Sequence, residues 1–426
     1  MTPPSKERIK ELEQSIHEAV TVNGFVSWRH AHEYEEGIEA LIPIFEEMIE
    51  NGDGEDSRHL IELTMRLMER NWPKADDSSG GLSFVFKNLQ NLHLRACETF
   101  SSDLKELAQH LFTWAMKSDY DAFHDAPRRY AKVLGVEGMS ELRRLVKAKF
   151  SLVPVLRPDT DAKGRSDDHF RITDWALQLA EESGDLNQII HVLNRDLSSP
   201  YSFLKIAENC RNHGREDLAL KWAEDGIASF ETKRRDSRLF TFLSFAYSKA
   251  GRHEDALKFM WVNFINSGHH YLEEYENLKI VAEAADTWPE WREKALTHVK
   301  EGRYHTHEPG ADILIKILLW EGKLAPAAET ANENGCSVFV WDALAKALAE
   351  TKPKEAYHAY ENLTGFLLVD YTHYGNRAWI AETIRKMSML SEQIGNENTF
   401  QLWLTDIREQ HKRRTGFLND LKRLKL

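Results

Sequence analysis

The sequence predicts an all-α protein, a right-handed α–α superhelix of antiparallel helical hairpins. The first observation is a phrase that recurs along the second half of the chain: a small or apolar residue, a glycine seven residues on, and an alanine five beyond it. Second, the glycines Gly214, Gly251 and Gly322 are 37 (251 − 214) and 71 (322 − 251) residues apart, so the second gap is about two periods. Third, no segment shows the strict alternation that a half-buried strand requires.

Each copy of the phrase predicts two short helices closed by a glycine turn, with small residues where the helices cross. A period in the mid-thirties with this pattern is typical of tetratricopeptide arrays. One such hairpin cannot bury its apolar face alone, so its neighbours must cover it. The residues that we expect to frame the repeats are Ala207, Gly214, Ala219, Gly251, Ala256, Gly322 and Ala327.

The N-terminal part also reads as helices. Tyr34–Asn51 places six apolar residues on one stripe with glutamates opposite, which predicts a single amphipathic helix. Gly52 and Gly54 end it, and Arg58–Arg70 follows as its antiparallel partner. A further helix is expected around Phe84–Thr99.

A polar segment predicts the main division of the chain. Arg157–Asp168 contains no apolar residue except Ala162, so we expect a surface loop or hinge at 157–169. It would separate an N-terminal helical region, 1–156, from a tetratricopeptide-like array at 170–426. Within the array, Trp341–Leu363 repeats the hairpin pattern and carries a proline in its turn.

Composition excludes several classes of protein. With 42% hydrophobic and 29% charged residues among 426, the chain is typical of a folded globular protein rather than a disordered one. No apolar run reaches the length of a membrane span, and the first residues lack the apolar core of a signal peptide, so we expect no membrane contact and a cytoplasmic location. The three cysteines are odd in number and widely spaced, which argues against a disulfide framework. The oligomeric state stays open.

Several phrases in order along most of the chain resemble one family. They are VSWRHAHEYEEGI, NLQNLHLRAC, RDLSS, GRHEDAL, LWEG, NGCSVFVW and HKRRTGFLNDLKRL. Together they are similar to the long C-terminal helical region of bacterial SWIM zinc-finger proteins. In that family a finger of Cys-x-Cys followed by Cys-x-His lies upstream and supplies the zinc site. This chain has neither pair, so the resemblance implies the helical array without its metal module, and it leaves open a zinc-finger partner in trans.

No pattern in the sequence points to catalysis or to a metal. Gly-x-Ser-x-Gly, the P-loop, Gly-x-Gly-x-x-Gly and His-Glu-x-x-His are all absent. His305 and His307 stand two apart in a loop, but they lack a third ligand at a recognisable spacing. We therefore predict no catalytic residues, no metal and no cofactor.

Two basic stretches stand out against a net charge of −13, which itself opposes binding of nucleic acid over the whole surface. Arg128–Lys149 and His411–Leu426 each carry five more cations than anions. Such patches contact phosphates or an acidic partner. The alternative is a solvated helix face with cations near a helix C-terminus. The candidate contacts are Arg128, Arg129, Arg143, Arg144, Lys147, Lys412, Arg413 and Arg414.

Three functions follow, in order of preference. The first is a non-catalytic scaffold or adaptor that binds a protein or peptide in the groove of its array, since a curved stack offers a long continuous surface. The second is an accessory of nucleic-acid enzymes, related to SWIM zinc-finger proteins, that contacts phosphates through the basic stretches. The third is an unrecognised enzyme, whose mark would be a deep pocket with several convergent titratable groups.

Overall fold

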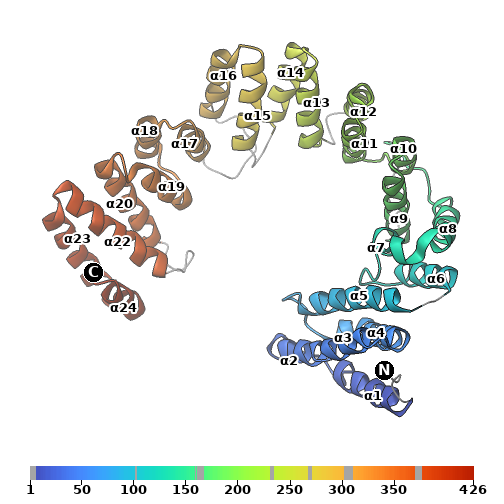
Figure 1. Ribbon diagram of the computed structural model, residues 1–426. Coiled ribbons are helices and arrows are strands. Elements are labelled where there is room, and N and C mark those ends of the chain that lie inside the picture. The colour runs from blue at the N-terminus through green and yellow to red at the C-terminus, as the bar shows by residue number, and fades with distance from the viewer. Residues whose placement is uncertain are drawn as a thin grey trace. The chain divides into compact units, whose positions relative to one another are not determined.

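The computed structural model describes residues 6–100, 103–158, 160, 167–230, 235–266, 271–301, 310–369 and 377–426. Every regular element in these ranges is helical (Figure 1), and the described β-structure is limited to two isolated parallel bridges, Val26 with Ala75 and Leu156 with Asp196. The all-α class predicted from the sequence is therefore confirmed. None of the described helices is both long and apolar enough to cross a membrane.

The chain divides into two compact units, Met1–Arg234 and Arg235–Leu426. The described helices of the first unit are α1 (Lys6–Val20), α2 (Trp28–Glu39), α3 (Ile42–Glu50), α4 (Gly54–Asn71), α5 (Gly81–Thr99), α6 (Leu104–Ala115), α7 (Ala126–Arg129), α8 (Ala131–Phe150), α9 (Asp167–Ser183), α10 (Leu186–Leu193), α11 (Pro200–Asn212) and α12 (Glu216–Ser229), with a short 3₁₀ turn at Trp72–Lys74 after α4.

The second unit continues the same construction. Its described helices are α13 (Ser237–Lys249), α14 (His253–Phe264), α15 (Tyr271–Ala284), α16 (Trp288–Lys300), α17 (Gly310–Trp320), α18 (Leu324–Asn334), α19 (Val338–Leu348), α20 (Pro353–Val369), α22 (Arg377–Ile394), α23 (Glu397–Gln410) and α24 (Thr415–Arg423). The expected hairpin at Trp341–Leu363 corresponds to α19 and α20, and its proline, Pro353, is the first residue of α20.

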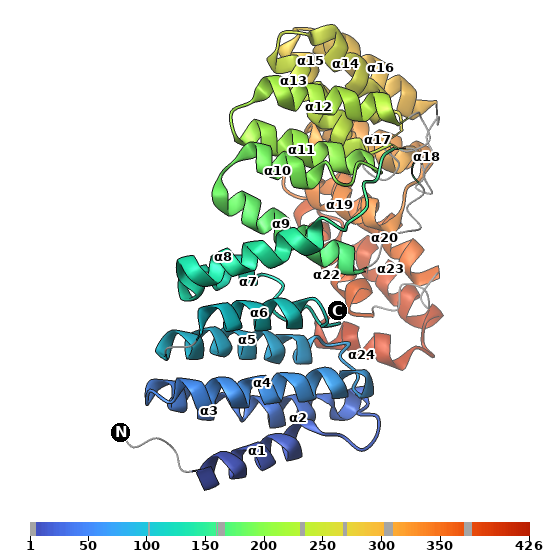
Figure 2. The same cartoon turned by 90° about the vertical axis from the view of Figure 1, so that its right-hand side faces the viewer.

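Neighbouring helices in the sequence pack against each other in space. In the first unit α4 lies between α1 and α5, α6 packs on α8, and α11 pairs with α12 (Figure 2). In the second unit α13, α15, α17 and α19 also contact one another in turn, as the first helices of successive hairpins do in a repeat array. The core of the first unit is continuous from Leu12 in α1 to Val192 in α10.

Side-chain caps fix where several helices begin. The carboxylate of Asp103 accepts hydrogen bonds from the N–H groups of Lys105 and Glu106 at the start of α6. Ser199 caps α11 in the same way, and Pro200 follows at the first helical position, where its missing N–H costs nothing. These local signals set the register of helices whose inner faces form the core.

The structure differs from the sequence prediction at one boundary and leaves another outside the described residues. The single helix predicted for Tyr34–Asn51 is wrong, since α2 ends at Glu39 and α3 begins at Ile42. Pro43 is tolerated in the first turn of α3, but it would break a continuous helix if it lay in the interior. The hinge predicted at 157–169 falls largely outside the described residues and stays a prediction. In the sequence, the boundary of the two compact units falls between Arg234 and Arg235.

Three of the hairpin turns share one backbone conformation. Gly214, Gly251 and Gly322 have φ values of 73°, 75° and 72°, and the N–H of the following residue bonds to a carbonyl five residues back in each case. Asp286, 35 residues after Gly251, has a φ of 55° and occupies the same place between α15 and α16. The 71-residue gap in the glycine pattern therefore contains one more hairpin, whose turn uses aspartate.

Candidate functional site

A buried polar cluster of the first unit is centred on Glu62 in α4. This glutamate is only 7% exposed. Arg58 and Arg66 lie one turn before and after it on the same helix, with Nε of Arg58 3.2 Å from Oε1 and Nη2 of Arg66 2.9 Å from Oε2. The i, i+4, i+8 spacing therefore places one carboxylate between two guanidinium groups.

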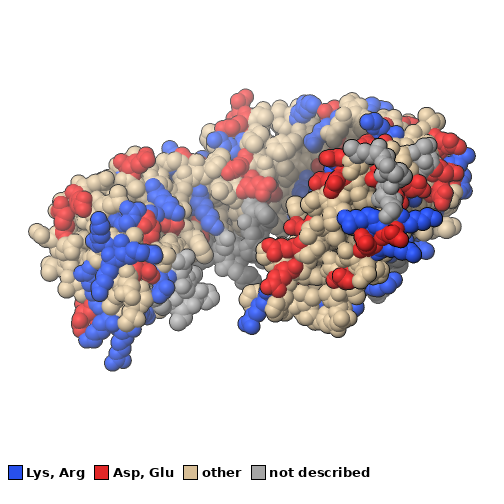
Figure 3. Space-filling view, turned by 60° about the horizontal axis from the view of Figure 1, so that its bottom comes forward, with Lys and Arg blue, Asp and Glu red and all other residues tan. Residues whose placement is uncertain are grey.

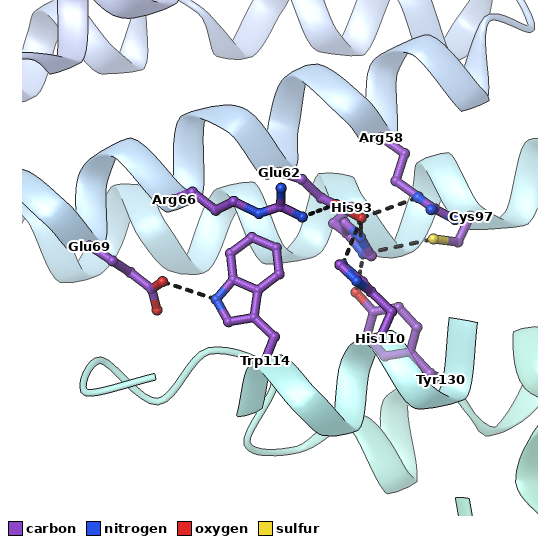
Figure 4. Close-up of polar contacts among 9 residues, drawn as sticks. All are labelled: Arg58, Glu62, Arg66, Glu69, His93, Cys97, His110, Trp114 and Tyr130. Carbon is purple, nitrogen blue, oxygen red and sulfur yellow. Dashed lines mark hydrogen bonds and ion pairs between the residues drawn. The ribbon is translucent and has the colours of Figure 1, made fainter. Parts of the chain in front are cut away.

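Two histidines from the next helices reach the same carboxylate (Figure 4). Nε2 of His93 in α5 and Nε2 of His110 in α6 each lie 3.1 Å from Oε1 of Glu62. His93 is completely buried, whereas the side chain of His110 is 28% exposed. The cluster thus joins three successive helices, and both His110 and Arg66, whose side chain is 57% exposed, reach the surface.

Behind His93 the cluster ends at the start of α8. The hydroxyl of Tyr130 lies 2.8 Å from Nδ1 of His93, and Sγ of Cys97 lies 3.7 Å from the same nitrogen. Because the carboxylate of Glu62 can only accept, Nε2 of His93 carries the proton and Nδ1 accepts from Tyr130. A directed series of hydrogen bonds therefore runs from Tyr130 through His93 to Glu62.

Burial and hydrogen bonding set the charges in this cluster. Burial raises the pKa of Glu62, but the contacts with His110 and His93 outweigh it and hold the pKa below its ordinary value. Burial lowers the pKa of His93 and outweighs the attraction of Glu62. Burial also raises the pKa of the Cys97 thiol to about 12. The cluster therefore contains an ionised Glu62, a neutral His93 and an unreactive thiol.

A second buried contact adjoins the cluster. The indole Nε1 of Trp114 in α6 donates to Oε2 of Glu69 in α4 at 3.0 Å, and the hydroxyl of Ser118 donates to the other oxygen of Glu69. The guanidinium of Arg66 lies 4.9 Å from the Trp114 ring centroid, in the range of a cation–π contact. Arg66 therefore links the Glu62 and Glu69 contacts, and α4 and α6 are held together at two levels.

A cavity of about 470 Å³ opens beside Glu62. The N-terminal halves of α4 and α6 form most of its wall, and Phe100, just after α5, completes it. The lining residues are Glu55, Arg58, His59, Glu62, Phe100, Asp103, Glu106, Leu107 and His110. Glu62 and His110 of the cluster line this cavity. His93 and Tyr130 lie behind them and do not reach it.

Negative charge dominates this lining. Of its four carboxylates, Glu62 is paired with Arg58 and Arg66, and Asp103 caps α6. Glu55 and Glu106 form no ion pair with any residue that the structure describes. His59 pairs with Glu13 of α1 at 2.8 Å. In the described ranges no three His, Cys, Asp or Glu side chains are placed to hold a metal ion, and His305 and His307 lie outside those ranges.

The structure pairs most of the first basic stretch with carboxylates. Arg128 forms an ion pair with Glu181, and Arg143 lies 3.4 Å from Glu182, which ties α7 and α8 to α9. Arg144 pairs with Glu141, and Arg129 contacts Asn91 and Asp125. Lys147 is exposed and forms no ion pair with a described residue. Carboxylates therefore offset much of the positive charge of this stretch.

The second basic stretch is less neutralised. Lys412 pairs with Glu409, and Arg414 donates to the carbonyl of Leu368 at 3.2 Å. Arg413, Lys422 and Lys425 are exposed and form no ion pair with a described residue. In the second unit, Lys and Arg side chains gather on the face shown at the left of Figure 3.

The repeat-framing residues lie where hairpins close. Ala207, Ala219, Ala256 and Ala327 are at most 1% exposed, so each is packed between helices. The glycines that accompany them, Gly214, Gly251 and Gly322, form the left-handed turns described above. None of these residues lines the cavity.

Sequence reasoning missed the Glu62 cluster. Its members come from four segments between residues 58 and 130, and no motif joins them. One signal was available: Glu62 lies among the apolar residues Leu60, Ile61 and Met65, which are all fully buried. A charged residue within an apolar stripe is buried only when it is paired.

Paired antiparallel helices joined by left-handed turns and stacked on their sequence neighbours define a helical-repeat protein. The chain belongs to the family of unknown function DUF6880, which matches residues 5–420. No curated protein matches the chain.

Solved structures offer distant likenesses. The chain is similar to the tetratricopeptide domain of P58(IPK), with 12% identity, a TM-score of 0.22 and coverage of 91% of this chain and 97% of that one. It is also similar to a human IFIT1 dimer with m7Gppp-AAAA, with 11% identity, a TM-score of 0.26 and coverage of 100% and 96%. A circular tandem repeat protein has 14% identity and a TM-score of 0.16, with coverage of 98% and 96%.

Proposed function

We propose that this protein is a non-catalytic scaffold or adaptor that binds a protein or peptide partner in the cytoplasm. The observation that carries the proposal is the cavity beside Glu62, where unpaired carboxylates lie on a framework of stacked helices. Repeat arrays present extended surfaces that such proteins use for binding. The buried cluster behind the cavity fixes its wall, so that little ordering is needed when a partner binds.

The test is affinity purification with matched variants. The native chain should retain a discrete partner at low salt, and the double variant Glu55→Lys, Glu106→Lys should lose it, because both carboxylates would be replaced by cations. Glu47→Lys changes an exposed glutamate of α3 outside the cavity and serves as the control. Recovery of no partner at all would sink the proposal, and equal recovery with the native chain and the double variant would show that the partner does not bind at this cavity.

The cavity also bears on the enzyme alternative, which stays the third proposal. Its support is one ionised carboxylate and one histidine that meet at a cavity wall, Glu62 and His110. Three cluster residues with a shifted pKa, His93, Tyr130 and Cys97, are buried behind the wall and do not line the cavity. We therefore favour binding over catalysis at this place.

A nucleic-acid accessory role is the second proposal, and the free cations near α24 favour it. Arg413, Lys422 and Lys425 are exposed without carboxylate partners in the described chain, unlike Arg128, Arg143 and Arg144. The resemblance to SWIM zinc-finger proteins supports the same proposal, with the finger supplied by another chain.

A salt titration of binding to labelled DNA and RNA tests this role. Each phosphate contact contributes roughly one unit to the slope of log affinity against log salt. Lys422→Ala and Lys425→Ala should each lower the slope by about one. Arg143→Ala, which removes a cation already paired with Glu182, should leave it unchanged. No binding at low salt would remove the proposal.

A further inference from the structure

We propose that the cavity beside Glu62 binds a guanidinium or primary ammonium group. The inference rests on the proposed function and names the chemistry of the partner: a basic side chain that enters between the first turns of α4 and α6. The same chemistry occurs in free amines such as agmatine, so the experiment below compares the two sources.

The charge of the lining favours a cation. Glu55, Asp103 and Glu106 have no basic partner in the described chain, while Glu62 is offset by Arg58 and Arg66. The N-termini of α4 and α6 add about half a positive charge each. Against these three carboxylates stand about one positive charge from the two helix N-termini and one from the second arginine at Glu62, so a net charge of about −1 remains and favours a cation over phosphates and acidic peptides.

One guanidinium, that of Arg58, already occupies the aromatic face in this wall, so a second cation would meet the carboxylates of Glu55 and Glu106. The guanidinium carbon of Arg58 lies 5.6 Å from the ring centroid of Phe100, and Nε of the same side chain lies 3.2 Å from Oε1 of Glu62. An aromatic face with a carboxylate beside it is the environment that a planar cation prefers. Glu55 and Glu106 offer the remaining carboxylate oxygens to a ligand.

The buried cluster holds the wall of the cavity in place and does not itself bind the ligand. Arg58, Arg66 and the two histidines already surround both oxygens of Glu62, so this carboxylate stays fixed whether or not a cation is bound. Glu55 and Glu106 are the binding groups, and Glu62 is a positioning residue. A volume of about 470 Å³ lies within the range of roughly 300–1,000 Å³ typical of small-ligand pockets, so an arginine side chain fits.

Titration calorimetry with the full chain tests the inference. The probes are agmatine, a short peptide with one arginine, and the same peptide with citrulline, which keeps the shape and loses the charge. Agmatine and the arginine peptide should bind. The affinity of the citrulline peptide should be lower by about tenfold or more, the loss expected for a charge-assisted hydrogen bond. Citrulline binding as tightly as arginine would overturn the inference.

Variants separate the site from the rest of the acidic surface. Glu106→Gln and Glu55→Gln should each weaken the arginine peptide by about tenfold, and Glu47→Gln on α3 should leave it unchanged. Circular dichroism confirms that each variant is folded. Unchanged affinity in Glu106→Gln and Glu55→Gln together would refute the assignment of the site.

The outcomes also distinguish this inference from the proposed function. Tighter binding of the arginine peptide than of agmatine identifies a partner's side chain as the source of the cation. Binding of agmatine alone supports the cation site and overturns the claim about a partner. If a partner is retained from cells but the Glu55 and Glu106 variants do not affect it, the scaffold proposal stands at another surface and this inference fails.

Discussion

Nε2 of His93 lies 3.1 Å from Oε1 of Glu62, and both side chains are shielded from water between α4 and α5. The pair lies at the centre of a network that also includes Arg58, Arg66 and, through His93, Tyr130. Removing one partner of a buried ionic contact leaves the others without compensation. The strength of this network can therefore be measured by single substitutions.

We expect Glu62→Gln to destabilise the first unit by about 3 kcal/mol or more, because two arginines lose their anion. Hydrogen exchange in peptides from α4 and α5, converted to opening free energies, would measure the loss. Glu106→Gln is the matched control at an exposed site, with an expected change within about 0.5 kcal/mol. Similar protection in Glu62→Gln and the native chain would show that the cluster does not stabilise the fold.

We expect the free energy of unfolding of the first unit to decrease over two separate pH ranges as the pH is lowered. The pKa of His93 is lowered by burial, so below about pH 6.5 the unfolded chain takes up a proton that the folded chain refuses. The loss is at most about 1.4 kcal/mol per pH unit for this group. Glu62, whose pKa is also lowered, adds a second loss below about pH 4.3, where the unfolded carboxyl protonates first.

The substitution His93→Gln checks the first of these pH ranges. It removes the titrating group, so stability measured by urea unfolding should depend less on pH between about 6.5 and 5 than in the native chain. An identical slope in both chains would assign the pH dependence to other groups.

Close packing of α8 on α6 should make Gly138 intolerant of a side chain. A Cβ atom there would lie 2.9 Å from the carbonyl oxygen of Leu104 and 2.9 Å from the side chain of Leu134. We expect Gly138→Ala to cost about 1–3 kcal/mol, since the helices would have to move apart. Gly37→Ala in α2 meets nothing within 4 Å and should instead stabilise by up to about 1 kcal/mol. Thermal unfolding distinguishes the two, and a reversed order would contradict the packing.

We expect substitutions at the turn residues Gly251 and Asp286 to have opposite effects on stability. Both residues have positive φ, 75° and 55°. Gly251→Ala should destabilise the second unit by about 1–2 kcal/mol through the backbone alone, because no atom lies within 4 Å of the added Cβ. Asp286→Gly should relieve the same strain and leave stability equal or higher. Chemical unfolding of the two variants measures this, and a marked loss in Asp286→Gly would show that its side chain stabilises the turn.

The sequence by itself determined the all-α class and the hairpin frame. Those features depend on contacts within about 35 residues, where a glycine turn and small residues at helix crossings leave a visible period. The turn at Asp286 escaped that pattern because aspartate also adopts the left-handed conformation, and the break between α2 and α3 escaped it because the apolar stripe continues across Pro43.

Only the tertiary structure decided which charged residues act together. Glu62, His93, His110 and Tyr130 meet because α4, α5, α6 and α8 stack, and nothing in the spacing of these residues along the chain encodes that meeting. The same holds for Arg128 and Arg143, whose partners Glu181 and Glu182 come from a later helix. Local patterns record the periodicity of a helix, whereas the pairing of charges depends on which faces the packing brings together.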